Sequence, residues 1–193
     1  GEPIPYMKGK EVQVIKMEEL NTGMLFWADQ VLVATNATRT RINNEMRQIL
    51  GRGDKPEDGD KVICCRNYWD LLADNASPLI NGTIGTIQNS FVSFNKLPGF
   101  FFSNYTPKNI DVLRANFIGD CGENYGVLPM DNKMILEGVK TLDWKTEYKI
   151  AKNPKYSSLL PLEFTYAYAI TTHKSQGSEW DKVLVIEERF PFD

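Results

Sequence analysis

A polar stretch near the C-terminus, ITTHKSQGSEWDKVLVIEE, holds the side chains best suited to chemistry. It contains His173, the single histidine of the 193 residues, close to Ser175 and Glu179. A histidine beside a serine could serve as the base that activates a nucleophilic hydroxyl. The sequence HKSQG, however, is not the G-x-S-x-G turn that exposes such a serine, and one histidine cannot form a histidine-rich metal site. We therefore interpret the stretch as a binding loop.

Donor groups are dense in this loop, a composition that suits phosphate oxygens. They belong to Thr171, Thr172, His173, Lys174, Ser175 and Gln176. Gly177 would let a backbone approach a ligand closely, and Glu179 could accept a hydrogen bond from a ribose hydroxyl. The plainer alternatives are that His173 caps a turn, Gly177 supplies a positive φ and Glu179 is a solvated charge. The density of the cluster favours binding.

Two arginines form the second candidate site. Arg39 and Arg41 fall in the first turn of the expected helix NATRTRINNEMRQILG, where the helix dipole prefers anions and each cation costs about 0.3–1 kcal/mol. One of them could meet a bound phosphate at the C-terminal edge of a parallel sheet, where ligands of open α/β sheets bind. The alternative is that both arginines are solvated and reach acidic neighbours.

The elements around both candidates are typical of an α/β domain. Residues 30–35, QVLVAT, form a short apolar run that predicts a central parallel strand, and the helix after it has Asn36 or Thr38 as its N-cap. Residues 164–171, FTYAYAIT, and 181–188, DKVLVIEE, predict two more strands. If the first two strands are parallel, the two candidate sites lie at the same edge of the sheet.

The middle of the chain predicts a different fold. GDKVICCRN reads as a turn and a strand, and LINGTIGTI contains Asn81-Gly82, a strong hairpin signal. Short apolar runs from FVSF to KMILEG follow, punctuated by Gly, Pro or Asn and without a convincing amphipathic helix. We interpret this region as a small β-barrel, with KNPKYSSLLP, residues 152–161, as a flexible return linker.

These patterns divide the chain into three segments. We expect residues 1–58 to form the first part of the α/β domain, 59–161 to form the inserted β-barrel and 162–193 to complete the α/β domain.

Composition narrows the class of protein. A hydrophobic content of 42% is enough for a real core, and no apolar run approaches the roughly 20 residues that cross a bilayer. The N-terminal GEPIPYMKGK lacks the pattern of a signal peptide, so we expect neither secretion nor a membrane span.

The three cysteines, Cys64, Cys65 and Cys121, fit no disulfide framework or metal-ligand spacing, which favours a reducing cytosol. The net charge of -3 gives no global attraction for nucleic acid, so such binding needs a local patch.

Two motifs of nucleotide hydrolysis are missing from the sequence. It contains no G-x-x-x-x-G-K-[ST] phosphate loop and no acidic pair after a strand in the manner of a magnesium-binding motif. We therefore expect that this chain by itself does not hydrolyse a nucleotide.

Several of these stretches resemble a known family. AYAITTHKSQGSEWDKVLV resembles motif V of superfamily 1 DNA helicases of the RecD and Dda branch, including bacteriophage relatives, and ATNATRTRINNEMR is similar to their motif IV region. GDKVICCRN with LINGTIGTI resembles the start of the SH3-like barrel inserted into their second motor domain. The resemblance implies a partial RecA-like parallel-sheet domain, 2A, interrupted by an SH3-like all-β barrel, 2B. The first RecA-like domain, and motif VI after EERFPFD, would lie outside this sequence.

The resemblance also implies roles for single residues. DNA-backbone contacts would come from Thr171 and His173, with Thr35, Asn36, Thr172 and Lys174 nearby. Nucleotide contacts would come from Arg39 or Arg41 at the γ-phosphate, from Gln176 and Gly177 on the path that couples DNA to ATP, and from Glu179 at the sugar. In the barrel, Tyr68, Trp69 and Phe100 to Phe102 would stack on bases or belong to the core.

By this resemblance the chain is the C-terminal portion of an ATP-dependent 5′–3′ DNA helicase. It would contribute single-stranded DNA contacts and one wall of the ATP cleft, with no catalytic residue and no metal site of its own. ATP and Mg²⁺ would bind the full-length protein and not this fragment alone. Its partners would be single-stranded DNA and the missing N-terminal RecA-like domain, and it would be a monomer in a bacterial or phage-infected cytoplasm. The alternative is a non-enzymatic nucleic-acid or protein adaptor built on the β-barrel.

Overall fold

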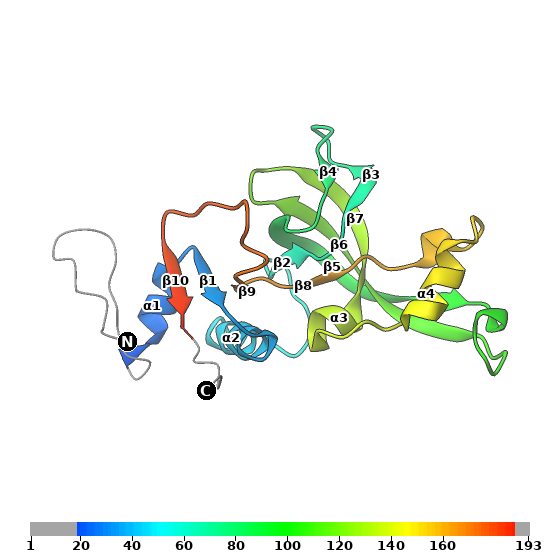
Figure 1. Cartoon of the computed structure of the whole chain (residues 1–193), viewed down its shortest axis with the longest axis horizontal. Coiled ribbons are helices and arrows are strands. Elements are labelled where there is room, and N and C mark those ends of the chain that lie inside the picture. Colours follow the sequence, from blue (N-terminus) through cyan, green and yellow to red (C-terminus); the bar gives the residue numbers. More distant parts are fainter. Residues whose placement is uncertain (1–18, 188–193) are drawn as a thin grey trace, which may run out of the picture.

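Two sheets of different kinds lie along the long axis of the molecule (Figure 1). The computed structural model describes residues 19–187, which form a three-stranded parallel sheet, a five-stranded antiparallel sheet and a two-stranded ribbon. The mixed α/β class predicted from the sequence, a parallel-sheet part interrupted by a β-rich insertion, is confirmed. The expectations for GEPIPYMKGK and, beyond Glu187, for EERFPFD lie outside the described residues.

The parallel sheet has the order β10-β1-β9, with β1 (Gln30–Val33) between β9 (Ala169–Thr171) and β10 (Val183–Ile186). The prediction of a central parallel strand is therefore confirmed. Two helices, α1 (Thr22–Trp27) and α2 (Asn36–Ile49), share a buried apolar cluster with these strands. The cluster explains why an apolar run of four residues can form a strand here.

Helix α2 begins earlier than the sequence suggested. Its N-cap is Thr35, whose Oγ1 accepts a hydrogen bond from the Thr38 N–H at 3.2 Å, so the prediction of Asn36 or Thr38 as the cap is wrong. Because the helix starts at Asn36, Arg41 lies beyond the first turn and Arg39 at its end. Of the two arginines, only Arg39 is therefore close enough to the helix N-terminus to incur the free-energy cost of a cation in the first turn.

The antiparallel sheet has the order β7-β6-β5-β2-β8. Its strands are β2 (Lys61–Cys64), β5 (Ile84–Leu97), β6 (Lys108–Gly119), β7 (Asn124–Asp131) and β8 (Phe164–Tyr166). The ribbon consists of β3 (Tyr68–Leu72) and β4 (Pro78–Leu79). Long arms of β5 and β6 extend away from the parallel sheet (Figure 1).

Two strand predictions need correction. FTYAYAIT is not one strand, because β8 pairs with β2 in the antiparallel sheet and β9 pairs with β1 in the parallel sheet. Asn81-Gly82 forms a turn, with Gly82 at φ +98 and the Thr83 N–H donating to the Ile80 carbonyl at 3.1 Å, but the strands on its two sides do not pair with each other. Alternating apolar residues are compatible with either sheet, so the local pattern does not identify a strand's partner.

The insertion also contains helices that the sequence analysis did not expect. They are α3 (Asn132–Glu137) and α4 (Trp144–Ala151), with the short 3-10 turns η2 (Gly99–Phe101) and η3 (Ser157–Leu159). Asp131 and Asp143 cap α3 and α4, and both helices are too short to show a long amphipathic period.

Residues 152–161 are not a flexible linker. They contain η3, and the Leu159 carbonyl accepts a hydrogen bond from Nδ2 of Asn95 at 2.8 Å. Tyr156 and Leu160 pack against a buried cluster at the base of α4.

No helix within residues 19–187 has the length and apolar character needed to cross a membrane.

Candidate functional site

Two loops meet at the carboxyl edge of the parallel sheet. Strands β1 and β9 are parallel, Val33 is in register with Thr171, and the Thr172 N–H donates to the Val33 carbonyl at 3.0 Å. The loop after β9 therefore begins next to the N-terminus of α2. This confirms that the parallel strands bring the two candidate sites to one edge.

Tight turns shape the loop after β9. The Lys174 N–H donates to the Thr171 carbonyl at 2.8 Å, and both the N–H and the hydroxyl of Ser175 donate to the Thr172 carbonyl. Thr172 and His173 are exposed. Within residues 19–187 no hydrogen bond joins His173 to Ser175, whose hydroxyl proton is already donated to the backbone. The geometry therefore does not support a serine nucleophile with a histidine base.

A groove of about 490 Å³ opens where this loop, α2 and the insertion meet. Its lining residues are Asn36, Ala37, Arg39, Thr40, Cys65, Met134, Glu137, Gly138, Glu163, Thr165 and Lys174. We call it the α2–α3 groove. One wall comes from the N-terminal half of α2 and the other from α3, β8 and the end of β2. The groove therefore lies between the two sheets.

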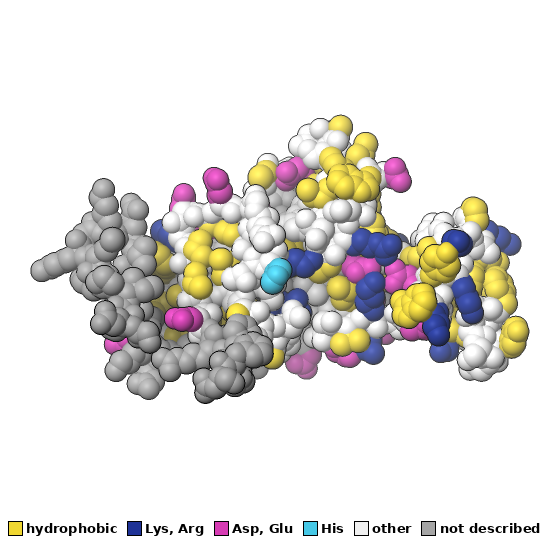
Figure 2. Space-filling model, in the orientation of Figure 1, with side chains coloured by type: hydrophobic (Ala, Val, Ile, Leu, Met, Phe, Trp, Pro, Cys, Tyr) yellow, Lys and Arg dark blue, Asp and Glu magenta, His cyan; other side chains and the backbone are white. Residues whose placement is uncertain are grey.

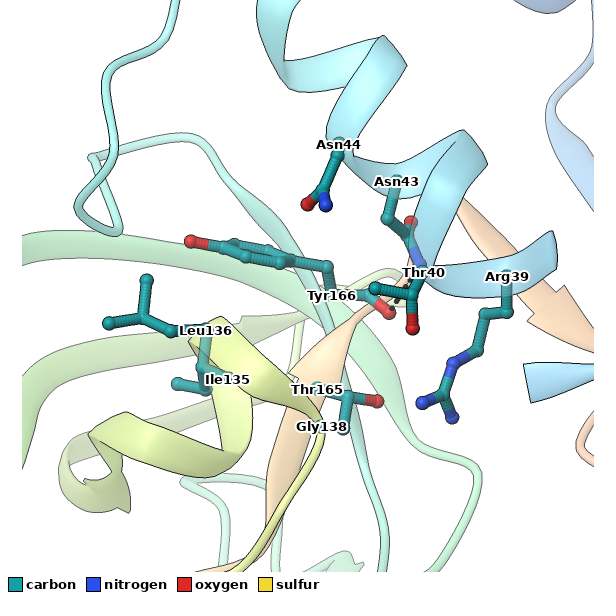
Figure 3. Close-up of a pocket in the computed structure, with 9 residues that line it drawn as sticks. All are labelled: Arg39, Thr40, Asn43, Asn44, Ile135, Leu136, Gly138, Thr165 and Tyr166. Atoms are coloured by element: carbon teal, nitrogen blue, oxygen red, sulfur yellow. Dashed lines mark hydrogen bonds between the residues drawn. The ribbon is translucent and has the colours of Figure 1, made fainter. Parts of the chain in front are cut away.

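Arg39 lines this groove and extends from α2 toward Gly138 and Thr165 (Figure 3). Gly138 is the C-cap of α3 and has a left-handed backbone conformation with φ +71. A Cβ atom at Gly138 would lie 3.4 Å from Nη2 of Arg39. A small cavity of about 10 Å³, room for roughly one water, lies beside it between α2 and β8. In the described range 19–187, the guanidinium makes no ion pair and no hydrogen bond. Arg39 is therefore a free cation at the groove.

Arg41 lies apart from the groove and does not line it. Its Nη1 is 3.3 Å from Oε1 of Glu45, one helical turn further along α2, and its side chain is half exposed. The alternative of a solvated arginine with an acidic neighbour therefore describes Arg41, whereas Arg39 reaches the groove.

Lys174 is held at the rim of the groove by the insertion. Its Nζ donates to Oδ1 of Asn81, and the Asn81 N–H donates to Oδ1 of Asn67 at 2.8 Å. The turn at Asn81-Gly82 thus touches the loop after β9. The sequence did not suggest this contact, because the two segments are more than 90 residues apart.

The acidic residues of the groove are paired with cations elsewhere. Glu163 and Glu147 share Arg66 and Lys140 in a network with distances of 2.5–3.3 Å, and Glu137 pairs with Lys133 at 3.8 Å. Burial lowers the pKa of Lys140, but its hydrogen bonds to the two carboxylates outweigh this and the net pKa is raised. Because these acids are neutralised, Arg39 and Lys174 give the groove a positive character that suits an anion.

Two buried amides fix the segment that joins the sheets. Nδ2 of Asn43 donates to the carbonyls of Tyr166 at 3.3 Å (Figure 3) and Ala169 at 3.0 Å, and its Oδ1 accepts from the Ala169 N–H at 2.8 Å. Nε2 of Gln30 donates to the carbonyls of residues 167 and 168 at 3.1 and 3.2 Å. These bonds set how the two walls of the groove meet.

Sequence reasoning missed both amides and the groove residue Cys65. The available signal was weak: Gln30 begins the otherwise apolar strand β1, and Asn43 follows Ile42 in a helix that is largely polar. Such a residue is informative because buried polar groups need partners, but the partners themselves are not visible in the local sequence.

The other predicted site residues are spread around this edge. Asn36 lines the groove, and Thr35 caps α2. Gln176, Gly177 and Glu179 are exposed further along the loop, outside the groove lining, and Gly177 has φ +86. Among residues 19–187 there is no cluster of three or more His, Cys, Asp or Glu side chains that could hold a metal.

Comparisons with known proteins found similarity to solved structures. No protein-family model and no curated protein matches the chain. The chain is similar to the structure of Pif1 helicase from Candida albicans, with 18% sequence identity and a TM-score of 0.39. The similarity covers 81% of this chain and 38% of that one, so the chain spans less than half of that helicase.

Proposed function

We propose that this chain is the C-terminal part of an ATP-dependent DNA helicase of superfamily 1, in the RecD and Dda branch, that moves 5′ to 3′. The proposal rests on the sequence resemblance of its motif IV and motif V stretches. One observation carries it: the parallel register of β1 and β9 places both stretches at one sheet edge, beside a groove with two cations. A phosphate loop and the remaining nucleotide contacts would come from a first motor domain.

The DNA side of the proposal is the α2–α3 groove. Asn36, Arg39 and Lys174 line it, and exposed His173 lies in the same loop as Lys174. The sequence resemblance implies that Arg39 or Arg41 meets the γ-phosphate of ATP. We instead assign Arg39 to a DNA phosphate, because it shares the groove with Lys174 and has no carboxylate partner within the described chain. Arg41, paired with Glu45, is not needed for this contact. Guanidinium and ammonium groups are the usual partners of backbone phosphates.

The nucleotide side would be formed by Gln176, Gly177 and Glu179. Their exposure suits one wall of a cleft that a second domain completes. Bound ATP would supply free energy through loss of its γ-phosphate, and the residues of this chain would only position it. The same loop carries His173 and Lys174 on the DNA side. Binding of DNA or of ATP can therefore shift the loop between conformations and so change the affinity for the other ligand.

Neutralising the two groove cations is expected to weaken single-strand binding. In the double variant Arg39→Gln and Lys174→Gln, the slope of log K against log salt should fall in magnitude by about 1.4, since each phosphate contact contributes about 0.7. Fluorescence anisotropy of a fluorescein-labelled dT20 measures both affinity and slope. Arg41→Gln, on the same helix, is the matched control and should leave the slope unchanged.

The same titration distinguishes the helicase proposal from the alternative of an adaptor that binds through its β-barrel. Equal losses for Arg39→Gln and Arg41→Gln would reflect overall charge only and would contradict the groove assignment. Unchanged binding in the double variant, with loss only on substitution in the insertion, would instead favour an adaptor that binds through its β module.

A further inference from the structure

The outward face of α4 carries aromatic side chains where a solvated face usually carries polar ones. Thr146 and Ile150 turn inward and are buried. Trp144 and Tyr148, four residues apart and therefore on one side of the helix, are 71% and 54% exposed. Two large rings left in water on a helix of eight residues have no role in the core that α4 covers.

Lysines alternate with these rings. Nζ of Lys145 lies 5.7 Å from the Trp144 ring centroid, and Nζ of Lys152 lies 4.6 Å from that of Tyr148. Lys149 is exposed on the same helix. In the described residues none of these three lysines forms an ion pair with a carboxylate. The face is therefore positive, although the whole chain has a net charge of -3.

The surface continues onto the neighbouring turns. Phe100, 53% exposed, packs on Phe101 and on Tyr156, with ring centroids 4.4 and 5.6 Å apart. Nζ of Lys155 lies 5.3 Å from the Tyr156 ring centroid. Figure 2 shows hydrophobic and basic side chains interspersed over this end of the molecule, on the same face as the histidine.

We propose that this α4 surface, made of Trp144, Lys145, Tyr148, Lys149 and Lys152, binds single-stranded DNA. Bases would stack on the two exposed rings while the lysines contact phosphates, the combination found in sequence-tolerant single-strand sites. A protein partner would favour a continuous apolar patch, whereas here each ring adjoins an ammonium group. The proposal extends the proposed function, because this second site lies on the same face as the histidine, whose neighbour Lys174 lines the α2–α3 groove.

Anisotropy with fluorescein-labelled dT20 and the 193-residue chain tests the surface. The variant Trp144→Ala with Tyr148→Ala should raise Kd about fivefold or more, the smallest effect expected when stacking is lost. The triple variant Lys145→Gln, Lys149→Gln and Lys152→Gln should lower the magnitude of the salt slope by about 2. Trp144→Phe keeps a ring and should retain the affinity.

Trp27→Ala is the control, because Trp27 is 52% exposed in α1, beside the parallel sheet and outside the α4 surface. It should leave Kd unchanged, and circular dichroism establishes that each variant is folded. Unchanged Kd and slope in both α4 variants would overturn the proposal. A loss of dT20 affinity in the α4 variants but not in the Arg39→Gln and Lys174→Gln variant would support the α4 surface and contradict the groove assignment. A loss of affinity only in the Arg39→Gln and Lys174→Gln variant would support the groove and contradict the α4 surface.

Discussion

Replacing Asp60 with Asn is expected to lower the free energy of unfolding by about 3–5 kcal/mol, the cost of breaking a buried ion pair from one side. Asp60 is fully buried, and its Oδ1 lies 3.2 Å from Nε of Arg47 and 3.3 Å from Nε of Arg52. It also accepts hydrogen bonds from the Tyr168 hydroxyl and the Glu57 N–H, both at 2.8 Å. The substitution would leave two arginines without their carboxylate.

Urea unfolding followed by circular dichroism measures this loss. Asp54→Asn, an exposed carboxylate a few residues away, is the matched control and should change stability by less than about 0.5 kcal/mol. Asp60 joins α2, through Arg47, to the segment that leads into β9, through Tyr168. Equal stabilities of the two variants would mean that Asp60 does not tie the sheets together.

Replacing Phe117 with Ala should destabilise the insertion by about 3–5 kcal/mol, as expected for removal of a fully buried ring. Phe117 is completely buried in β6, with its ring centroid 5.1 Å from that of Phe164 and 5.6 Å from that of Tyr125. Phe164 belongs to β8, and β5 and β2 lie between β6 and β8 in the sheet order, so the lost contact joins strands that are not neighbours.

The control for this change is Val127→Ala, which removes an exposed apolar side chain from β7. It should cost less than about 0.5 kcal/mol in the same urea titration. A Phe117→Ala variant as stable as Val127→Ala would contradict the packing described for this core.

The parallel sheet could be predicted because its signals are local. The apolar run at residues 30–33 and the helical spacing after it need no knowledge of partners, and an apolar strand followed directly by a helix is typical of a parallel sheet. The wrong helix start has a local cause as well. Thr35, Asn36 and Thr38 are all good caps, and only the backbone conformation selects Thr35.

The groove could not be predicted because its walls come from distant segments. Arg39 and Lys174 are 135 residues apart, and the position of Lys174 depends on Asn81 in the insertion. The two short helices of the insertion were missed although Asp131 and Asp143 mark their starts, since six to eight residues show too little periodicity.

Cys65 offers a direct test of whether single-stranded DNA occupies the α2–α3 groove. Its thiol lines the groove, whereas Cys121 is exposed elsewhere, and burial raises the pKa of Cys64 to about 12, which keeps that thiol unreactive. The measurement is the rate of alkylation of each cysteine by N-ethylmaleimide, read by peptide mass spectrometry with and without saturating dT20. We expect dT20 to slow alkylation of Cys65 and not of Cys121, and we expect this protection to be lost in the Arg39→Gln and Lys174→Gln variant. Equal Cys65 rates with and without dT20, at concentrations where anisotropy shows the chain fully bound, would contradict it.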